Sequence, residues 1–319
     1  MNPTRIHWLC APALLVALFL FAPRCAVALQ IELPGSTSQL VIDSGLESYD
    51  GLVLDAAGNL YTRVYGPGFL QVTPAATATP WSGTNAYNLV FAPDGTGYAT
   101  GAWPCNCIEK FSPDGLSSIL QADTLTWTDL AILPDGSLYG VVWIGTGQGI
   151  YRIDRTTGQP TVIFAGGPGP GGSGQFGGLA AGPDGQLYVN ASLDGSLAGR
   201  RLFRLDGSTL TPMITPADGA EVIAPGPAGR FLAISGVPGS LYIAAELWLY
   251  DPVSGVSNKV AITTPYFHEW DVAFRGTAFD ANREIVYVTE NHRIWALHLD
   301  LSTPARSESW GAVKALYRE

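Results

Sequence analysis

The sequence predicts an all-β protein, a six-bladed β-propeller built from four-stranded antiparallel blades. The main observation is a short pattern that occurs six times: an apolar stretch, a turn of the Pro-Asp-Gly type, and a second apolar stretch that often contains Leu-Tyr. The copies begin at residues 51, 88, 129, 178, 222 and 271, which are 37, 41, 49, 44 and 49 residues apart. A period in the forties with several short strands per unit is typical of propeller blades. The composition, with 38 glycines and 23 prolines, also favours a turn-rich fold.

The third copy shows how each blade is expected to form. Its first stretch is apolar with weak alternation, as in an innermost strand that is buried on both sides. Pro134, Asp135 and Gly136 then form a turn, because proline presets the backbone and glycine accepts a positive φ. The four strands are predicted, from the inside outward, at residues 130–133, 138–143, 150–154 and 161–164.

The sixth copy lacks an outer strand after residues 294–299. Residues 38–43 resemble the other outer strands, so we expect them to pair with residues 292–299 and to close the ring. Closure of this kind removes two open sheet edges. One propeller domain is therefore predicted over residues 29–301, and residues 302–319 form a tail that either packs on the ring or serves in sorting.

The first 28 residues have the features of a secretory signal peptide. Arg5 supplies a positive start, residues 14–21 are apolar, and Ala26-Val27-Ala28 is a small-x-small cleavage site. The apolar run is short for a membrane span, although a retained anchor is the alternative. We therefore expect a secreted or periplasmic protein with no membrane span after cleavage.

The charge of the chain excludes some classes of partner. Residues 1–28 contain Arg5, Arg24 and no acid, so cleavage would change the net charge from -10 to -12. An acidic chain without a basic cluster has no electrostatic surface for nucleic acid or anionic lipid. A small molecule, a sugar or a protein is the expected partner. After cleavage Cys105 and Cys107 are the remaining cysteines, and they allow a short bridge but not a structural zinc site.

Polar residues at the starts of the inner strands converge on one end of the central channel, here called the channel mouth. Carboxylate oxygens in such a ring suit Ca²⁺ or Mg²⁺, and either cation could polarise an ester or activate water. In the alternative interpretation, these side chains cap strand ends by binding backbone N–H groups of the next blade. The predicted metal ligands are Asp50, Asp129, Glu221 and Asp271.

Aromatic residues are also expected around the mouth: Trp81, Tyr87, Trp103, Trp127, Trp143 and Trp270. Flat apolar faces with polar edges bind sugars and peptides, but tryptophan also packs between blades. The predicted ligand-binding residues are Asn88, Trp103, Trp143, His268 and Trp270, and the adjacent Glu269 is a further polar candidate. Residues 169–174 match G-x-G-x-x-G without a following helix, which argues against a dinucleotide site. Asn190 begins a glycosylation sequon.

Residues 50–61 and 150–158 resemble the NHL and gluconolactonase-like (senescence marker protein type) six-bladed propellers. That resemblance implies a divalent cation at the channel mouth, bound by residues just before the inner strands. Asp50 stands where the family has a glutamate ligand, and Glu221 stands where it has an aspartate that binds metal and acts as the base. Gly177 replaces an asparagine ligand, and Thr128 replaces a further polar residue.

Two functions follow from these observations. The first is a non-catalytic secreted propeller that binds a ligand or a protein through its mouth and the loops around it. The second is a lactone or ester hydrolase of the gluconolactonase type, which depends on Ca²⁺ or Mg²⁺ and uses Glu221 as the catalytic base. Gly177 favours the first, because glycine has no side chain with which to coordinate a metal.

Overall fold

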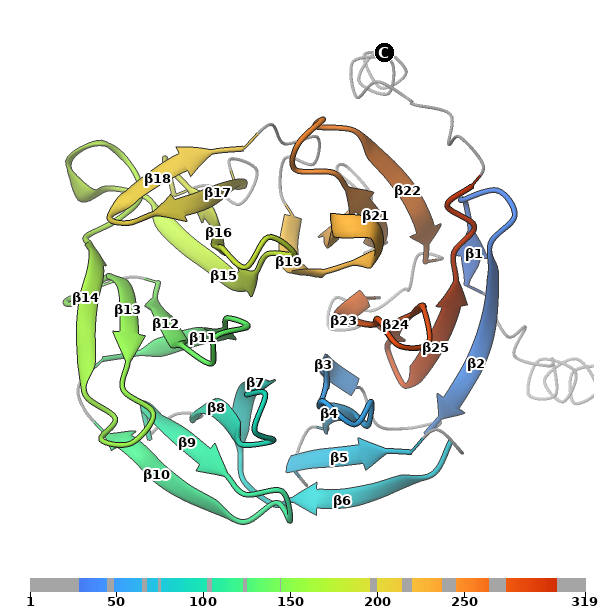
Figure 1. Ribbon diagram of the computed structural model, residues 1–319, viewed down its shortest axis with the longest axis horizontal. Helices are drawn as coiled ribbons and strands as arrows, with labels where there is room; N and C mark the ends of the chain where they lie inside the picture. Colours follow the sequence, from blue (N-terminus) through green and yellow to red (C-terminus); the bar gives the residue numbers. More distant parts are fainter. Residues whose placement is uncertain are drawn as a thin grey trace, which may run out of the picture.

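The structure is a computed structural model that describes residues 29–44, 49–64, 68–73, 76–101, 105–122, 125–143, 145–195, 200–213, 220–236, 245–263 and 274–302. These residues form six antiparallel sheets arranged in a ring around a central channel (Figure 1). The predicted six-bladed propeller is confirmed. The described residues contain no helix long and apolar enough to cross a membrane. The predicted signal peptide lies outside the described residues, and so does the predicted tail after Ser302.

The strands run outward from the channel in each blade. Blades one to three contain β3 (Tyr49–Leu54), β4 (Leu60–Val64), β5 (Gly68–Val72) and β6 (Ala78–Ser82); β7 (Ala86–Phe91), β8 (Gly97–Gly101), β9 (Cys107–Phe111) and β10 (Ser117–Ala122); β11 (Trp127–Ile132), β12 (Leu138–Val142), β13 (Gly149–Ile153) and β14 (Pro160–Ala165). Blades four to six contain β15 (Gln175–Ala181), β16 (Leu187–Ser192), β17 (Arg200–Asp206) and β18 (Thr209–Pro212); β19 (Ala220–Pro225), β20 (Phe231–Gly236), β21 (Ala245–Tyr250) and β22 (Ser257–Ile262); β23 (Phe274–Asp280), β24 (Ile285–Glu290), β25 (Arg293–His298) and β2 (Thr37–Asp43).

The N-terminal segment closes the ring as predicted and also reaches a second blade. Strand β2 pairs antiparallel with β25, so the first and last parts of the propeller lie side by side (Figure 1). The preceding strand β1 (Gln30–Ile31) adds a fifth strand to blade five by pairing with β22. Leu29 and Leu33 are buried, Leu29 in the apolar cluster between blades five and six. Residues 29–43 therefore join two blades, and the sequence had indicated only one of these contacts.

The Pro-Asp-Gly turns close the inner hairpins at the end of the ring opposite the mouth. In blade three the Asp135 carboxylate accepts the Ser137 backbone N–H at 2.8 Å, which holds the pKa of Asp135 below its usual value. Turns also link neighbouring blades. Arg155 of blade three forms an ion pair with Asp94 of blade two and donates to the Tyr98 hydroxyl at 3.0 Å. These contacts set the spacing of the blades at that end.

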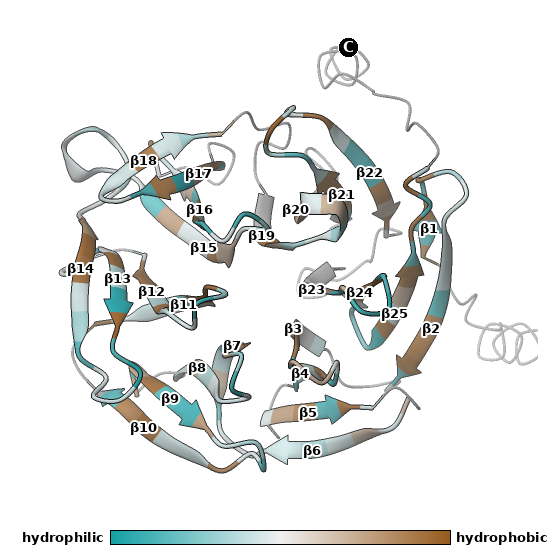
Figure 2. Cartoon of the chain, in the orientation of Figure 1, coloured by the Kyte–Doolittle hydropathy of each residue, from teal (hydrophilic) through white to brown (hydrophobic). Residues whose placement is uncertain are grey.

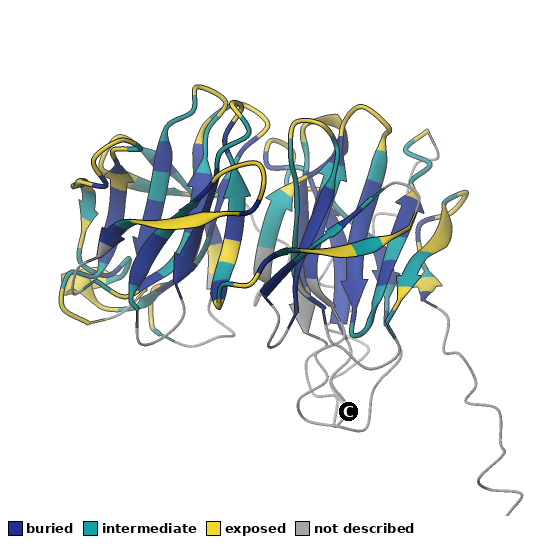
Figure 3. Cartoon of the chain, turned by 90° about the horizontal axis from the view of Figure 1, so that it is seen from below, coloured by how far each residue is buried: buried dark blue, intermediate teal, exposed yellow. Residues whose placement is uncertain are grey.

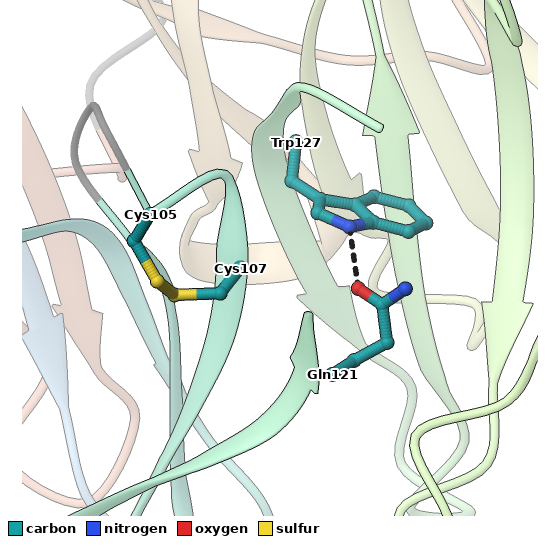
Figure 4. Close-up of a disulfide and its surroundings, with 4 residues drawn as sticks. All are labelled: Cys105, Cys107, Gln121 and Trp127. Atoms are coloured by element: carbon teal, nitrogen blue, oxygen red, sulfur yellow. Dashed lines mark hydrogen bonds between the residues drawn. A yellow bond between two sulfur atoms is a disulfide. The ribbon is translucent and has the colours of Figure 1, made fainter. Parts of the chain in front are cut away.

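Apolar side chains pack between adjacent sheets and bury the strands on both faces (Figures 2 and 3). The seam between blades one and two is aromatic. Trp81 stacks on Phe111 with ring centroids 5.3 Å apart, and its indole N–H donates to the Pro113 carbonyl at 3.1 Å. Trp127 is also buried and donates to Gln121 at 2.8 Å (Figure 4). Trp81 and Trp127 lie in strands and pack between blades, so the expectation that they belong to loops at the mouth is wrong.

Cys105 and Cys107 form a disulfide at the start of β9, with Cα atoms 5.1 Å apart (Figure 4). Cys107 is fully buried. Gly101, at the end of β8, lies so close that a Cβ atom there would overlap the Cys107 sulfur. The bridge foreseen from the spacing is therefore present.

Candidate functional site: the channel mouth

The centre of the ring holds a cavity of about 550 Å³ lined by the six inner strands β3, β7, β11, β15, β19 and β23. Each inner strand shifts register against its neighbour near its first residues, at the mouth end. Such bulges insert extra residues and redirect the side chains beside them. Consequently, all six strands enter the channel with an irregular backbone.

The bulge of blade two holds Asn88 in a left-handed conformation, with φ of 47°. The equivalent bulge of blade one has Gly51 at φ 72°, a backbone that glycine adopts without strain. Asn88 is exposed, and its side-chain amide donates a short hydrogen bond to the Thr128 carbonyl of blade three. A strained residue at the rim of a cavity is a common feature of functional sites, and here it also ties two blades together.

Asp129 is the predicted metal ligand whose side chain is best defined. Its two oxygens accept backbone N–H groups, from Leu130 at 2.8 Å and from Leu179 of blade four at 2.7 Å. Burial raises the pKa of the Asp129 carboxyl to about 7, although the two N–H groups act in the opposite direction. This is the capping arrangement that the alternative interpretation of the mouth carboxylates had foreseen.

The residues beside Asp129 offer little for a metal. The Thr128 hydroxyl donates to the Val141 carbonyl at 3.1 Å. Gly177 has no side chain, and a Cβ atom on Gly178 would lie 2.9 Å from an Asp129 oxygen. The space where the resemblance places a ligand from blade four is therefore next to a carboxylate that reaches across from blade three.

The channel wall also carries a cation that we had not selected from the sequence. Arg63, on β4, is only 4% exposed, and it lines the cavity. Its guanidinium carbon lies 3.8 Å from the centre of the Tyr87 ring, and one of its nitrogens donates to Asn85 at 3.2 Å. A guanidinium over an aromatic face is a favourable arrangement. The only signal in the sequence was a charged residue in the middle of an apolar strand.

Trp143 lies on the rim of the cavity and is 38% exposed, as expected for a ligand-binding aromatic residue. Gln148 supports this position: its amide donates to the Trp143 carbonyl at 2.7 Å and to the Gly174 carbonyl at 3.0 Å. Gly174 ends the glycine-rich loop, whose only regular element is the three-residue 3-10 turn η1 (Pro170–Gly172). No helix starts there, so the loop lacks the context of a dinucleotide site.

Glu290 is a buried acid at the mouth end of blade six that sequence reasoning did not select. One of its oxygens accepts the Trp295 indole N–H at 2.8 Å, and the other has no hydrogen bond. Burial raises the pKa of this carboxyl. Asn190, the sequon residue, is 1% exposed within β16, so the folded protein hides this acceptor from a glycosylating enzyme.

The remaining predicted site residues cannot be placed in the same detail. Asp50 and Glu221 lie in β3 and β19, where their backbones pair, but their side chains are not described. Trp103, His268, Glu269, Trp270 and Asp271 lie outside the described residues. Within the described part of the chain, no three His, Cys, Asp or Glu side chains form a group that could hold a metal. The metal ligands and the ligand-binding set stay predictions.

No protein-family model and no curated protein match this sequence. Solved structures of similar fold include a putative gluconolactonase (14% identity, TM-score 0.63, covering 85% of this chain and 97% of that chain). Another is a gluconolactonase from Xanthomonas campestris (13% identity, TM-score 0.63, covering 85% and 94%). A third is the calcium structure of a Trichoderma reesei carbohydrate-active enzyme of family AA12 (13% identity, TM-score 0.57, covering 86% and 98%). The resemblance to gluconolactonase-like propellers is thus confirmed at the level of the fold.

Proposed function

We propose that the protein is a non-catalytic binding module that holds a small ligand or a partner segment at its channel mouth. The observation that carries this proposal is the engagement of the polar side chains there. The Asn88 amide, the Thr128 hydroxyl and both Asp129 oxygens are already bound to backbone groups. Such side chains shape a cavity without leaving a base or a metal ligand in position. Trp143 and the Arg63–Tyr87 pair then supply the surface that a ligand contacts.

The location of this activity is also proposed to be outside the cytoplasm, in the periplasm or the medium. The signal-like residues 1–28 support it, and so does the Cys105–Cys107 disulfide, because such bonds persist mainly in oxidising compartments. A neutral or cationic ligand fits the negative charge of the chain, whereas nucleic acid does not.

A metal-dependent lactonase is the second candidate. The similarity in fold to two gluconolactonases favours it, as do the positions of Asp50 and Glu221 at the starts of two inner strands. Of the described residues, Asp129 fits a cation poorly, because its oxygens are occupied, and Gly177 offers no donor. A cation would therefore depend on Asp50 and Glu221. When bound, Ca²⁺ or Mg²⁺ would polarise the carbonyl of a lactone.

Metal addition separates the two candidates. For the binding module, we expect millimolar Ca²⁺, Mg²⁺ or chelator to change the melting temperature by less than about 1 °C, with no turnover of simple lactones. A resident metal at a hundred times its dissociation constant would instead stabilise the fold by about 2.7 kcal/mol, which is several degrees. Calorimetry and a lactone hydrolysis assay measure the two effects.

Matched variants make the result specific to the mouth. If metal stabilises the wild type, and Asp50→Ala or Glu221→Ala abolishes that effect while Asp135→Asn in a distant turn retains it, the hydrolase is supported and the binding-only proposal fails. Metal stabilisation that persists in all three variants would place the ion elsewhere.

A further inference from the structure

The carboxylate of Asp129 crosses the seam between two blades. It starts from the inner strand of blade three and accepts the N–H of Leu179 in the inner strand of blade four. Its other oxygen accepts the N–H of Leu130 in its own strand. One side chain therefore fixes the relative position of two inner strands at the cavity wall.

The segment that Asp129 holds has little else to fix it. Phe176 pairs with Ala191 and Leu179 pairs with Val189, so Gly177 and Gly178 bulge out between two regular pairs. Both glycines line the cavity, and neither has a side chain to pack. Two adjacent glycines are permissive in φ and ψ, so the bulge can take up other conformations at low cost.

The surroundings of Asp129 supply no ionised partner among the described residues. The elements packed against β11 contribute the titratable groups Tyr87 on β7, Tyr98 on β8 and Tyr139 on β12, whereas β15 contributes none. Arg63 lines the same cavity from blade one but stacks on Tyr87. The carboxylate is thus held by N–H groups alone, and burial raises its pKa to about 7.

We infer that Asp129 is a proton-operated latch on the channel wall: the carboxylate holds the bulge formed by Gly177 and Gly178 in place, and protonation releases it. N–H bonds to a charged oxygen are roughly twice as strong as those to a neutral one. When one oxygen gains a proton, the bond to Leu179 weakens and the bulge is free to move. The effect on a bound ligand rests on the proposed function, whereas the movement of the wall does not.

The latch predicts that local and global stability change in opposite directions. Because the pKa of Asp129 is higher in the folded state than its ordinary value of 3.8, this group stabilises the fold fully below about pH 4. That contribution is lost as the pH rises through about 7. Acidification from pH 8 to pH 5.5 therefore favours the folded protein through this group, while it loosens the Leu179 N–H.

Amide hydrogen exchange of the full chain tests the latch, with rates corrected for the intrinsic effect of pH. In the wild type, the protection of the Leu179 N–H is expected to fall about tenfold between pH 8 and pH 5.5. In Asp129→Asn, protection should be low at both pH values. Asp135→Asn is the matched control, because it removes an N–H-binding aspartate from an exposed turn, and Leu179 should then behave as in the wild type.

A second measurement needs no variant. The Leu179 and Leu130 amide resonances of the wild type should shift together with a midpoint near pH 7, while the Ser137 amide stays constant. Protection of Leu179 that is unchanged between pH 8 and pH 5.5, or that falls equally in Asp129→Asn, would overturn the latch. A failure to find any ligand would count against the proposed function only.

Discussion

Deletion of residues 29–44 is expected to prevent the ring from folding cooperatively, rather than merely to lower its melting temperature. The deletion removes β2 from blade six and β1 from blade five, which leaves the edges of β25 and β22 open. Open edges pair with other chains, so aggregation should follow. The loss of the buried Leu29 and Leu33 alone costs about 3–6 kcal/mol, at about 1.5–3 kcal/mol for each side chain. Size-exclusion chromatography and thermal unfolding measure the outcome.

A circular permutant is the matched control for this deletion. It begins at residue 49 and carries residues 29–44 after residue 302, joined by a short glycine-serine linker. The two ends of the closure are close, because the Asp300 backbone N–H donates to the Ser36 hydroxyl at 2.9 Å. The permutant should fold cooperatively. If the deletion variant stays soluble and unfolds cooperatively, another part of the chain closes the ring.

The propeller could be predicted from the sequence because each blade repeats the same local signals. Residues 130–133, Pro134-Asp135-Gly136 and residues 138–143 each encode their own structure through apolar runs and turn chemistry. Strand β2 was visible for the same reason. Strand β1 was not, since two residues carry no periodicity and their pairing with β22 depends on where the closed ring places them.

The site could be located from the sequence, but its chemistry could not. The repeat places Asp129 at the start of an inner strand, which the structure confirms. Whether its oxygens face a cation or a backbone N–H depends on the bulge of the next blade, which no local pattern reports. Arg63 was missed for a related reason: its contact with Tyr87 crosses a seam between blades.

The aromatic residues show the same limit, and they lead to the second large effect. Trp81→Ala is expected to destabilise the protein by about 3 kcal/mol, because it removes a large side chain from the seam between blades one and two. Its ring stacks on Phe111 and meets the edge of Tyr61 at 4.9 Å. The Pro113 carbonyl would also lose its N–H donor. At about 2–4 °C per kcal/mol, the melting temperature should fall by about 6–12 °C.

Trp143→Ala is the matched control, since it removes the same side chain from the rim of the channel. Trp143 is 38% exposed, so the substitution should change the free energy of unfolding by less than about 0.5 kcal/mol. Any small molecule that stabilises the wild type at the mouth should bind this variant at least about tenfold more weakly, because an aromatic anchor contributes most of its energy when a ligand covers it. Equal destabilisation by the two substitutions would make Trp143 a packing residue. Unchanged ligand affinity in Trp143→Ala would place the binding surface away from this rim.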